Sequence, residues 1–324
     1  MRLFLHFSDM QFARDAVPDA TVTAAARWLS QGIAQERWLL LDPALVDARR
    51  LRRIVPAGAS SSALLGSALE TFAEAAPQMI SVGAEVDLTS LVERIVDLDR
   101  TSPAMTLFKS IAPPSRIREV FAELALVRVD HDLRLHCRFA DARVLPSLLD
   151  VITPAQRGRI RGCIRAWGWI GASGVFVSRD FEAAEGQIEA STRSGSFCGL
   201  ELSAQQFARM LDDSEPDTVF ASLLDTVPEL VPGDGRGGFR GRLVDHLRSA
   251  DALGVHQPTD RLQFVVLSLT CGSDFHRAAI LGDTWKMMRE AGASLKSLMS
   301  TWSDATWEEI ERAARGSAVL SSRS

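Results

Sequence analysis

The spacing of apolar residues changes near position 190, and this change limits what the chain can fold into. Before it, short apolar runs such as 38–41 and 78–82 alternate with helical stretches. After it, apolar residues recur every three or four positions, as in 262–269. Strands alternating with helices predict a sheet covered by helices, whereas a run of helical periods predicts a bundle. We therefore expect an α+β protein, with a mixed β-sheet flanked by helices over residues 1–195 and an all-helical lobe over 196–324.

Several elements can be placed individually. Two alternating runs, 125–129 and 133–139, flank the polar residues 130–132 and predict a β-hairpin. Ser203, followed by Gln206 three residues later, predicts a capping box where a helix begins. In the first lobe the other expected strands are 38–41, 78–82, 105–111, 167–170 and 175–177, and the expected helices are 20–31, 62–75, 88–98 and 115–124.

Composition and cysteine usage predict a globular protein of the cytoplasm. Hydrophobic residues make up 46% and charged residues 24%, which is ordinary globular composition. The net charge of −5 offers no general attraction to nucleic acid or to an anionic membrane. The four cysteines form no CxxC pair, as expected for thiols in a reducing compartment. The apolar run 1–7 is too short for a signal peptide, and no segment reaches the length of a membrane span.

The residues that usually carry chemistry are scattered. His131 and His136 lie five positions apart on the expected hairpin, so their side chains should point to opposite faces. The other histidines lack metal-ligand spacing, and no G-x-S-x-G nucleophile motif occurs. The sequence therefore predicts no catalytic residue, no metal site and no cofactor, and hence a protein that is not an enzyme.

Three glycines leave one enzymatic alternative open. Gly233, Gly235 and Gly238 match the pattern G-x-G-x-x-G. A dinucleotide site also needs a strand directly before the glycines and a βαβ unit around them. The preceding residues 220–230 are helical in pattern and interrupted by Pro228. A loop between helices is therefore favoured, with a nucleotide-binding enzyme that uses this loop as the alternative.

A basic run and two tryptophans suggest a docking surface. Arg157, Arg159, Arg161 and Arg165 lie close together, and Trp167 and Trp169 follow them. The interleaved aromatic residues that stack on nucleic-acid bases are otherwise lacking. Tyrosine is absent from the chain while tryptophan, a frequent anchor in protein interfaces, occurs seven times. A solvated or protein-docking face is favoured over binding of nucleic acid.

Several short segments, in a fixed order, resemble one known family. Residues 38–44 (WLLLDPA) resemble an opening strand that ends in Asp-Gly or Asp-Pro. Residues 138–146 (RFADARVLP) resemble an Arg-Phe-Tyr-Asp-Pro-Arg-Val-Leu segment that follows a hairpin, with Ala140 and Ala142 replacing the tyrosine and the proline. These elements are similar to those of the effector-adaptor (chaperone) family of the type VI secretion system. Residues 76–80, 250–255 and 272–275 resemble further elements of that family.

The resemblance implies a non-catalytic adaptor with two protein partners. Such proteins bind a secreted effector, commonly through its N-terminal region, and load it onto the VgrG spike. Binding would use a groove between the lobes, or a sheet edge to which the effector adds a strand. An immunity protein that neutralises a toxin by direct binding is a further alternative. The candidate partner-binding residues are Arg138, Asp141, Arg143, Trp167 and Trp169.

A structural role for the polar residues among these candidates is equally compatible with the sequence. Arg138, Asp141 and Arg143 lie where a strand should pass into a helix. Asp141 could cap a helix that runs to about Val151, since its carboxylate can accept backbone N–H groups. The two arginines could fork onto carboxylates or carbonyl oxygens.

Overall fold

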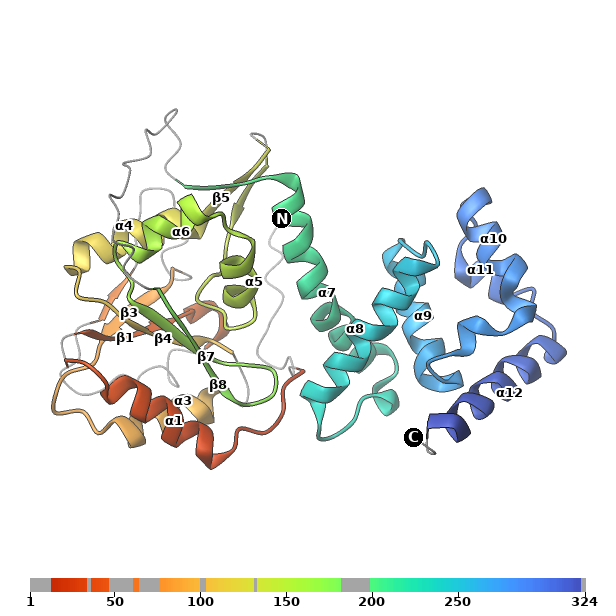
Figure 1. Cartoon of the computed structure of the whole chain (residues 1–324), viewed down its shortest axis with the longest axis horizontal. Helices are drawn as coiled ribbons and strands as arrows, with labels where there is room; N and C mark the ends of the chain where they lie inside the picture. The colour runs from red at the N-terminus through yellow and green to blue at the C-terminus, as the bar shows by residue number, and fades with distance from the viewer. Residues whose placement is uncertain are drawn as a thin grey trace. The chain divides into compact units, whose positions relative to one another are not determined.

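The chain divides into two compact units, Met1–Glu215 and Pro216–Ser324. The computed structural model describes residues 13–33, 36–46, 61–63, 76–99, 103–130, 133–181 and 199–321 (Figure 1). The division falls inside helix α7 (Ala204–Thr226), later in the chain than the boundary expected at 195/196. The reason is that Phe207 and Met210, in the first half of α7, pack against the core of the first unit.

A six-stranded antiparallel sheet forms the centre of the first unit. The expected strands at 38–41, 78–82, 105–111, 167–170 and 175–177 all belong to it. Residues 61–63 form an edge strand where a helix was expected to begin, and the rest of that expected helix, 64–75, lies outside the described residues. The strand order is β2 (Ser61–Ala63), β3 (Gln78–Ser81), β1 (Arg37–Leu41), β4 (Met105–Lys109), β7 (Ala166–Ile170) and β8 (Phe176–Asp180).

A second, three-stranded sheet contains the expected hairpin. Strands β5 (Leu126–Val129) and β6 (Leu133–His136) pair antiparallel, which confirms the hairpin. Strand β9 (Leu200–Leu202) pairs with β5 in parallel. The mixed pairing expected for this lobe is therefore found in the small sheet, whereas every pair in the large sheet is antiparallel.

Alternation along β1 divides the core of the first unit into two layers. Leu39 and Leu41 point to one face of the large sheet, against α1 (Asp19–Ser30) and α3 (Leu88–Asp99). Trp38 and Leu40 point to the other face. That face is covered by α4 (Pro114–Ala125), α5 (Val144–Val151) and α6 (Pro154–Arg161). Because both faces are covered, most residues of the central strands are apolar, as in the run Trp38–Leu41 of β1.

The second unit is helical throughout its described residues. Phe264, Phe275 and Trp285 pack together at its centre. Among the described residues, no helix combines the length and the apolar character that a membrane crossing requires. After the second half of α7, the elements are η5 (Pro228–Leu230), α8 (Arg236–Ala252), α9 (Pro258–Cys271), η6 (Phe275–Arg277), η7 (Ala279–Leu281), α10 (Gly282–Ala291), α11 (Leu295–Met299) and α12 (Asp304–Ser321).

Candidate functional site

Two acids and two arginines from distant parts of the chain form a polar cluster at one end of the large sheet. Nε of Arg138 lies 2.9 Å from Oδ2 of Asp42. Nε and Nη2 of Arg143 lie 3.0 and 2.7 Å from Oδ1 and Oδ2 of Asp141. Both carboxylates are buried, whereas each arginine side chain is 26% exposed. A partner could therefore reach part of each arginine side chain but hardly the carboxylates, and Nη2 of Arg138 is itself buried.

Asp42 is positioned by the end of β1. Its N–H donates to the carbonyl of Ala104, just before β4, at 2.8 Å. Its side chain accepts the N–H of Ala44 at 3.0 Å and so begins the short helix η3 (Pro43–Leu45). The Asp-Pro pair, which the sequence suggests as the end of a strand, thus also presents a carboxylate to Arg138.

Asp141 organises the turn that precedes α5. Its carboxylate accepts the N–H of Arg143 at 2.9 Å, and its carbonyl accepts the N–H groups of Val144 and Leu145. The residue at the N-cap of α5 is Arg143, not Asp141, and its side chain makes no capping hydrogen bond. The expected acceptance of a backbone N–H by the Asp141 carboxylate is therefore found, although Asp141 lies two residues before the N-cap of α5.

Burial dominates the electrostatics of the polar cluster. Loss of solvent raises the pKa of Asp42, and the nearby Arg138 offsets only part of this increase. The neighbouring negative charge of Asp141 raises the pKa of Asp42 further. Burial likewise raises the pKa of the Cys137 thiol, to about 12, so this thiol stays protonated at neutral pH. The charged form of Asp42 thus depends on Arg138, since an unpaired buried charge is costly.

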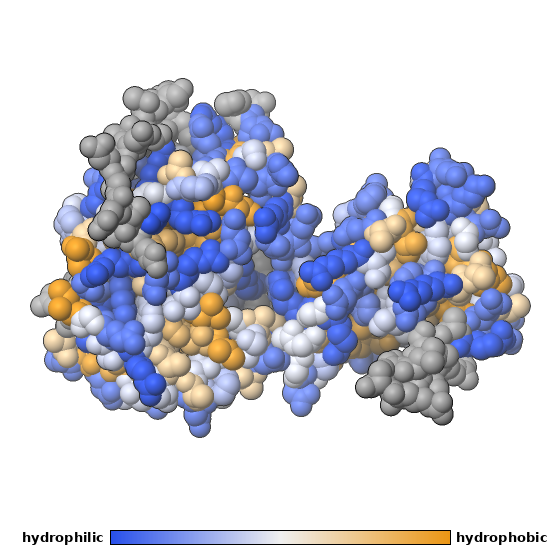
Figure 2. All heavy atoms as spheres, viewed as in Figure 1, coloured by the Kyte–Doolittle hydropathy of each residue, from blue (hydrophilic) through white to orange (hydrophobic). Residues whose placement is uncertain are grey.

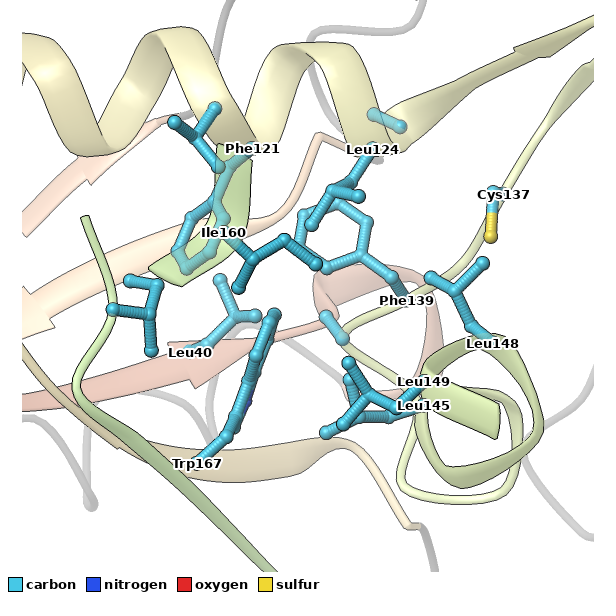
Figure 3. Packing of buried hydrophobic residues seen from close by; sticks show 14 of the residues in the cluster. Leu40, Phe121, Leu124, Cys137, Phe139, Leu145, Leu148, Leu149, Ile160 and Trp167 are labelled. Carbon is cyan, nitrogen blue, oxygen red and sulfur yellow. The ribbon is translucent and has the colours of Figure 1, made fainter. Parts of the chain in front are cut away.

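The segment that carries Arg138 and Arg143 is anchored by its aromatic residue. Phe139 packs against Phe121 and Trp167, with ring centroids 5.2 and 6.2 Å apart (Figure 3). Ala140 and Ala142, which stand where the resembled family has tyrosine and proline, are both buried. A larger side chain at position 140 would therefore have to fit into the packed interior of the protein.

The two candidate tryptophans lie away from the surface. Trp167 and Trp169 are on β7, an interior strand whose two faces are both covered, and both residues are buried. The indole N–H of Trp167 donates to Oγ1 of Thr106 at 3.0 Å. The structure thus corrects the expectation that these rings offer a docking surface. The ring of Trp167 packs against that of Phe139 inside the core, so a partner could not contact Trp167 without disrupting the core.

The basic run is largely engaged within the first unit. Arg157 donates to the carbonyl of Leu149 in the last turn of α5, at 3.1 Å. Arg159 lies 3.6 Å from a carboxylate oxygen of Glu123, and Arg165 lies 2.9 Å from one of Glu36. These arginines therefore contribute to the contacts of α5, α4 and β1. On the face shown in Figure 2, blue polar residues and small orange apolar groups are intermixed.

The glycine loop does not have the surroundings of a dinucleotide site. It follows the short helix η5 instead of a strand, and it leads into α8. Gly235 adopts a left-handed conformation with φ of 62° directly before α8, which explains a glycine at this position. Among the described residues, no group of three or more histidine, cysteine or acidic side chains could hold a metal ion. His131 and Cys198 lie outside the described residues.

Sequence reasoning missed Asp42 as a partner of Arg138. The signal that could have found it was the occurrence of both residues in segments that resemble the same family, 38–44 and 138–146. No curated protein and no solved structure matches the chain. Residues 37–159, from the start of β1 into α6, match a family model described as a domain of unknown function, DUF4123, and this stretch contains the whole polar cluster.

Proposed function

We propose that this protein is a non-catalytic adaptor that binds a type VI secretion effector and loads it onto the VgrG spike. The observation that carries the proposal is the DUF4123 match over residues 37–159, because this domain is associated with type VI effector adaptors. The polar cluster supports it. Residues 138–146, the segment with the most specific resemblance to that family, meet residues 38–44 there, through the ion pair of Arg138 with Asp42.

The polar cluster suits recognition better than chemistry. Each carboxylate already faces an arginine, so neither is poised to accept a proton from a substrate. The ion pairs hold the loop after β1 and the turn before α5 in one arrangement. A surface ordered before binding loses less conformational entropy when a partner docks. The side chains of Arg138 and Arg143 are each partly exposed, so a partner that docks over the cluster could contact them.

Co-purification tests the proposal. The tagged chain would be expressed together with the spike protein and the large toxin encoded nearest to its gene, each alone and both at once. We expect the chain to recover the effector with the spike. Recovery of neither protein over a range of salt concentrations would overturn the proposal. Recovery of the isolated toxin domain, with the spike ignored, would instead favour an immunity protein.

A further inference from the structure

Two histidines of the second unit lie in its packed interior. His246, on α8, is only 5% exposed. The ring of His276, on η6, contacts two phenylalanine rings, with centroids 5.8 Å from that of Phe264 and 5.9 Å from that of Phe275. Neither histidine belongs to the polar cluster, which lies in the first unit. Because imidazole gains a proton just below neutral pH, burial of these rings makes the packing around them depend on pH.

Nδ1 of His276 is buried without a hydrogen-bond partner among the described residues. A neutral imidazole can leave Nδ1 without a proton, whereas the charged ring carries a proton on both nitrogens. Protonation would therefore place an N–H without an acceptor in the interior of the second unit. A buried donor or charge that lacks a partner is costly, so the packed structure favours the neutral ring.

The charges around His246 oppose one another. Asp245, its neighbour on α8, favours the charged ring, whereas Arg242 and His276 disfavour it. Burial disfavours the charged ring more than any of these groups does, and the pKa of His246 is lowered as a result. Because a charge on His276 disfavours one on His246, the unit accommodates two charged rings even less well than one.

The surroundings of His276 act in the same direction. Burial lowers its pKa most, and the positive charge of Arg277 lowers it further. Asp274 and the backbone of Ser273 favour the charged ring, without a hydrogen bond to Nδ1, and offset only part of this decrease. The helices α9 and α12, which pack against η6, contribute the apolar residues Phe264, Leu267 and Ile310 to the core there.

The charged residues on the neighbouring helices are engaged elsewhere or exposed. Asp260 of α9 accepts the N–H of Leu295 at 2.9 Å, and Arg261 donates to the carbonyl of Val255 at 3.0 Å. The charged residues of α10 are exposed, and those of α12 up to Arg312 are exposed or half-buried. The charges that bear on the two histidines are therefore mainly those next to them in the sequence.

We infer that His246 and His276 make the packing of the second unit sensitive to acid. While both rings are neutral, η6 stays packed against α9 and α12. When either ring takes up a proton, this packing loosens, because the charge is then better accommodated in water. The inference holds whatever partner the chain binds, so it goes beyond the proposed function and does not rest on it.

The direction of the effect follows from the lowered pKa of both histidines. Near neutral pH the unfolded chain binds more protons at these two positions than the folded protein does. Their contribution to stability is therefore fully present above the ordinary histidine pKa of 6.5. It is lost as pH falls from there towards the lowered values of the folded protein.

Hydrogen exchange of the full-length chain at pH 7 and pH 5 tests the inference, because it follows the two units separately. Exchange is expressed as protection factors, which remove the ordinary dependence of exchange on pH. The variants are His246→Gln, His276→Phe and the two together, since neither new side chain can take up a proton in this range. His256→Gln is the matched control, because His256 is an exposed histidine of the same unit.

We expect protection of α9 and η6 to fall at least about tenfold between pH 7 and pH 5 in the wild type and in His256→Gln. The double variant should lose most of this pH dependence. Equal wild-type protection at the two pH values would overturn the inference, and so would an undiminished fall in the double variant. An equal fall in strands β1 and β4 of the first unit would reveal a general effect of acid and would also overturn it.

An NMR titration of the wild-type histidines decides the matter if the double variant fails to fold at pH 7. Titration of His246 or His276 below the ordinary pKa of 6.5, together with the loss of protection, would support the inference. Titration of both rings at or above that value would overturn it.

Discussion

Arg138 and Asp42 lie 96 positions apart in the chain, yet Nε of the arginine is 2.9 Å from Oδ2 of the aspartate. The aspartate follows the central strand β1, and the arginine follows the hairpin strand β6. Their contact connects the large sheet to the segment that leads into α5. It also brings together two of the short sequences, 38–44 and 138–146, that resemble elements of the adaptor family.

We predict that Arg138→Met destabilises the fold by about 2 to 3 kcal/mol, because it leaves the buried carboxylate of Asp42 without its charged partner. Adding Asp42→Asn should restore part of this loss, since the double variant buries no unpaired charge. Urea unfolding of the single and double variants measures the coupling. Arg179→Met is the matched control, because its ion pair with Asp150 is on the surface and should cost at most about 1 kcal/mol. Equal losses for Arg138→Met and Arg179→Met would contradict a special role for Arg138.

Asp42 should make stability depend on pH in a defined direction. Its pKa is raised in the folded state, mainly by burial, so the folded protein holds this proton more tightly than the unfolded chain does. The stabilisation from Asp42 is therefore fully present below its ordinary pKa and is lost as pH rises through the raised value. Relative to Asp42→Asn, the wild type should gain stability as pH falls from 7 towards 4. Urea unfolding of both proteins at several pH values measures this difference in stability. If the wild type instead lost stability relative to Asp42→Asn as pH falls, the ion pair with Arg138 would affect the pKa of Asp42 more than burial does.

Position 140 should not tolerate the tyrosine of the resembled family. Ala140 is fully buried, so Ala140→Tyr adds a ring to a packed interior. Overpacking of this kind costs about 1 to 3 kcal/mol, and we expect a corresponding fall in Tm. Ala172→Tyr, at an exposed position in the loop between β7 and β8, should leave Tm nearly unchanged. An unchanged Tm for Ala140→Tyr would mean that the ring finds a way to the surface.

The glycines of the 233–238 loop should respond differently to alanine. Gly235→Ala forces a side chain into a left-handed conformation, at a cost of about 1 kcal/mol. Gly238→Ala lies within α8 with open space around it, and it should stabilise the helix by about 0.5 to 1 kcal/mol. Thermal unfolding measures both changes. In the same assay we expect ATP and NAD to leave the Tm of the wild type unchanged, whereas a rise that grows with their concentration would favour the nucleotide-binding alternative.

Periodicity predicted much of the fold because it reports on burial. The continuous apolar run 38–41 is what a strand needs when both faces of its sheet are covered, and it forms most of β1. The hairpin β5–β6 and the capping box of α7 follow from local chemistry: Ser203 and Gln206 make both expected hydrogen bonds, at 3.2 and 2.9 Å. Such features need only neighbouring residues, and they are therefore visible in the sequence.

Features that depend on distant contacts were not predictable in the same way. The pairing of Asp42 with Arg138 and the parallel pairing of β9 with β5 each join residues far apart in the chain. Trp167 was expected at a surface because tryptophan is common in interfaces, but the sequence does not reveal that β7 is an interior strand. The boundary between the units fell later than expected because the first half of α7 packs with the first unit.

The central claim is that the chain delivers an effector to the spike, and the amount of effector recovered with tagged VgrG measures this most directly. The comparison is between the presence and the absence of this chain, at equal concentrations of effector and VgrG. The account predicts that effector is recovered on VgrG only when the chain is present, and that the chain itself is recovered there with it. Equal recovery of effector with and without the chain would contradict the account.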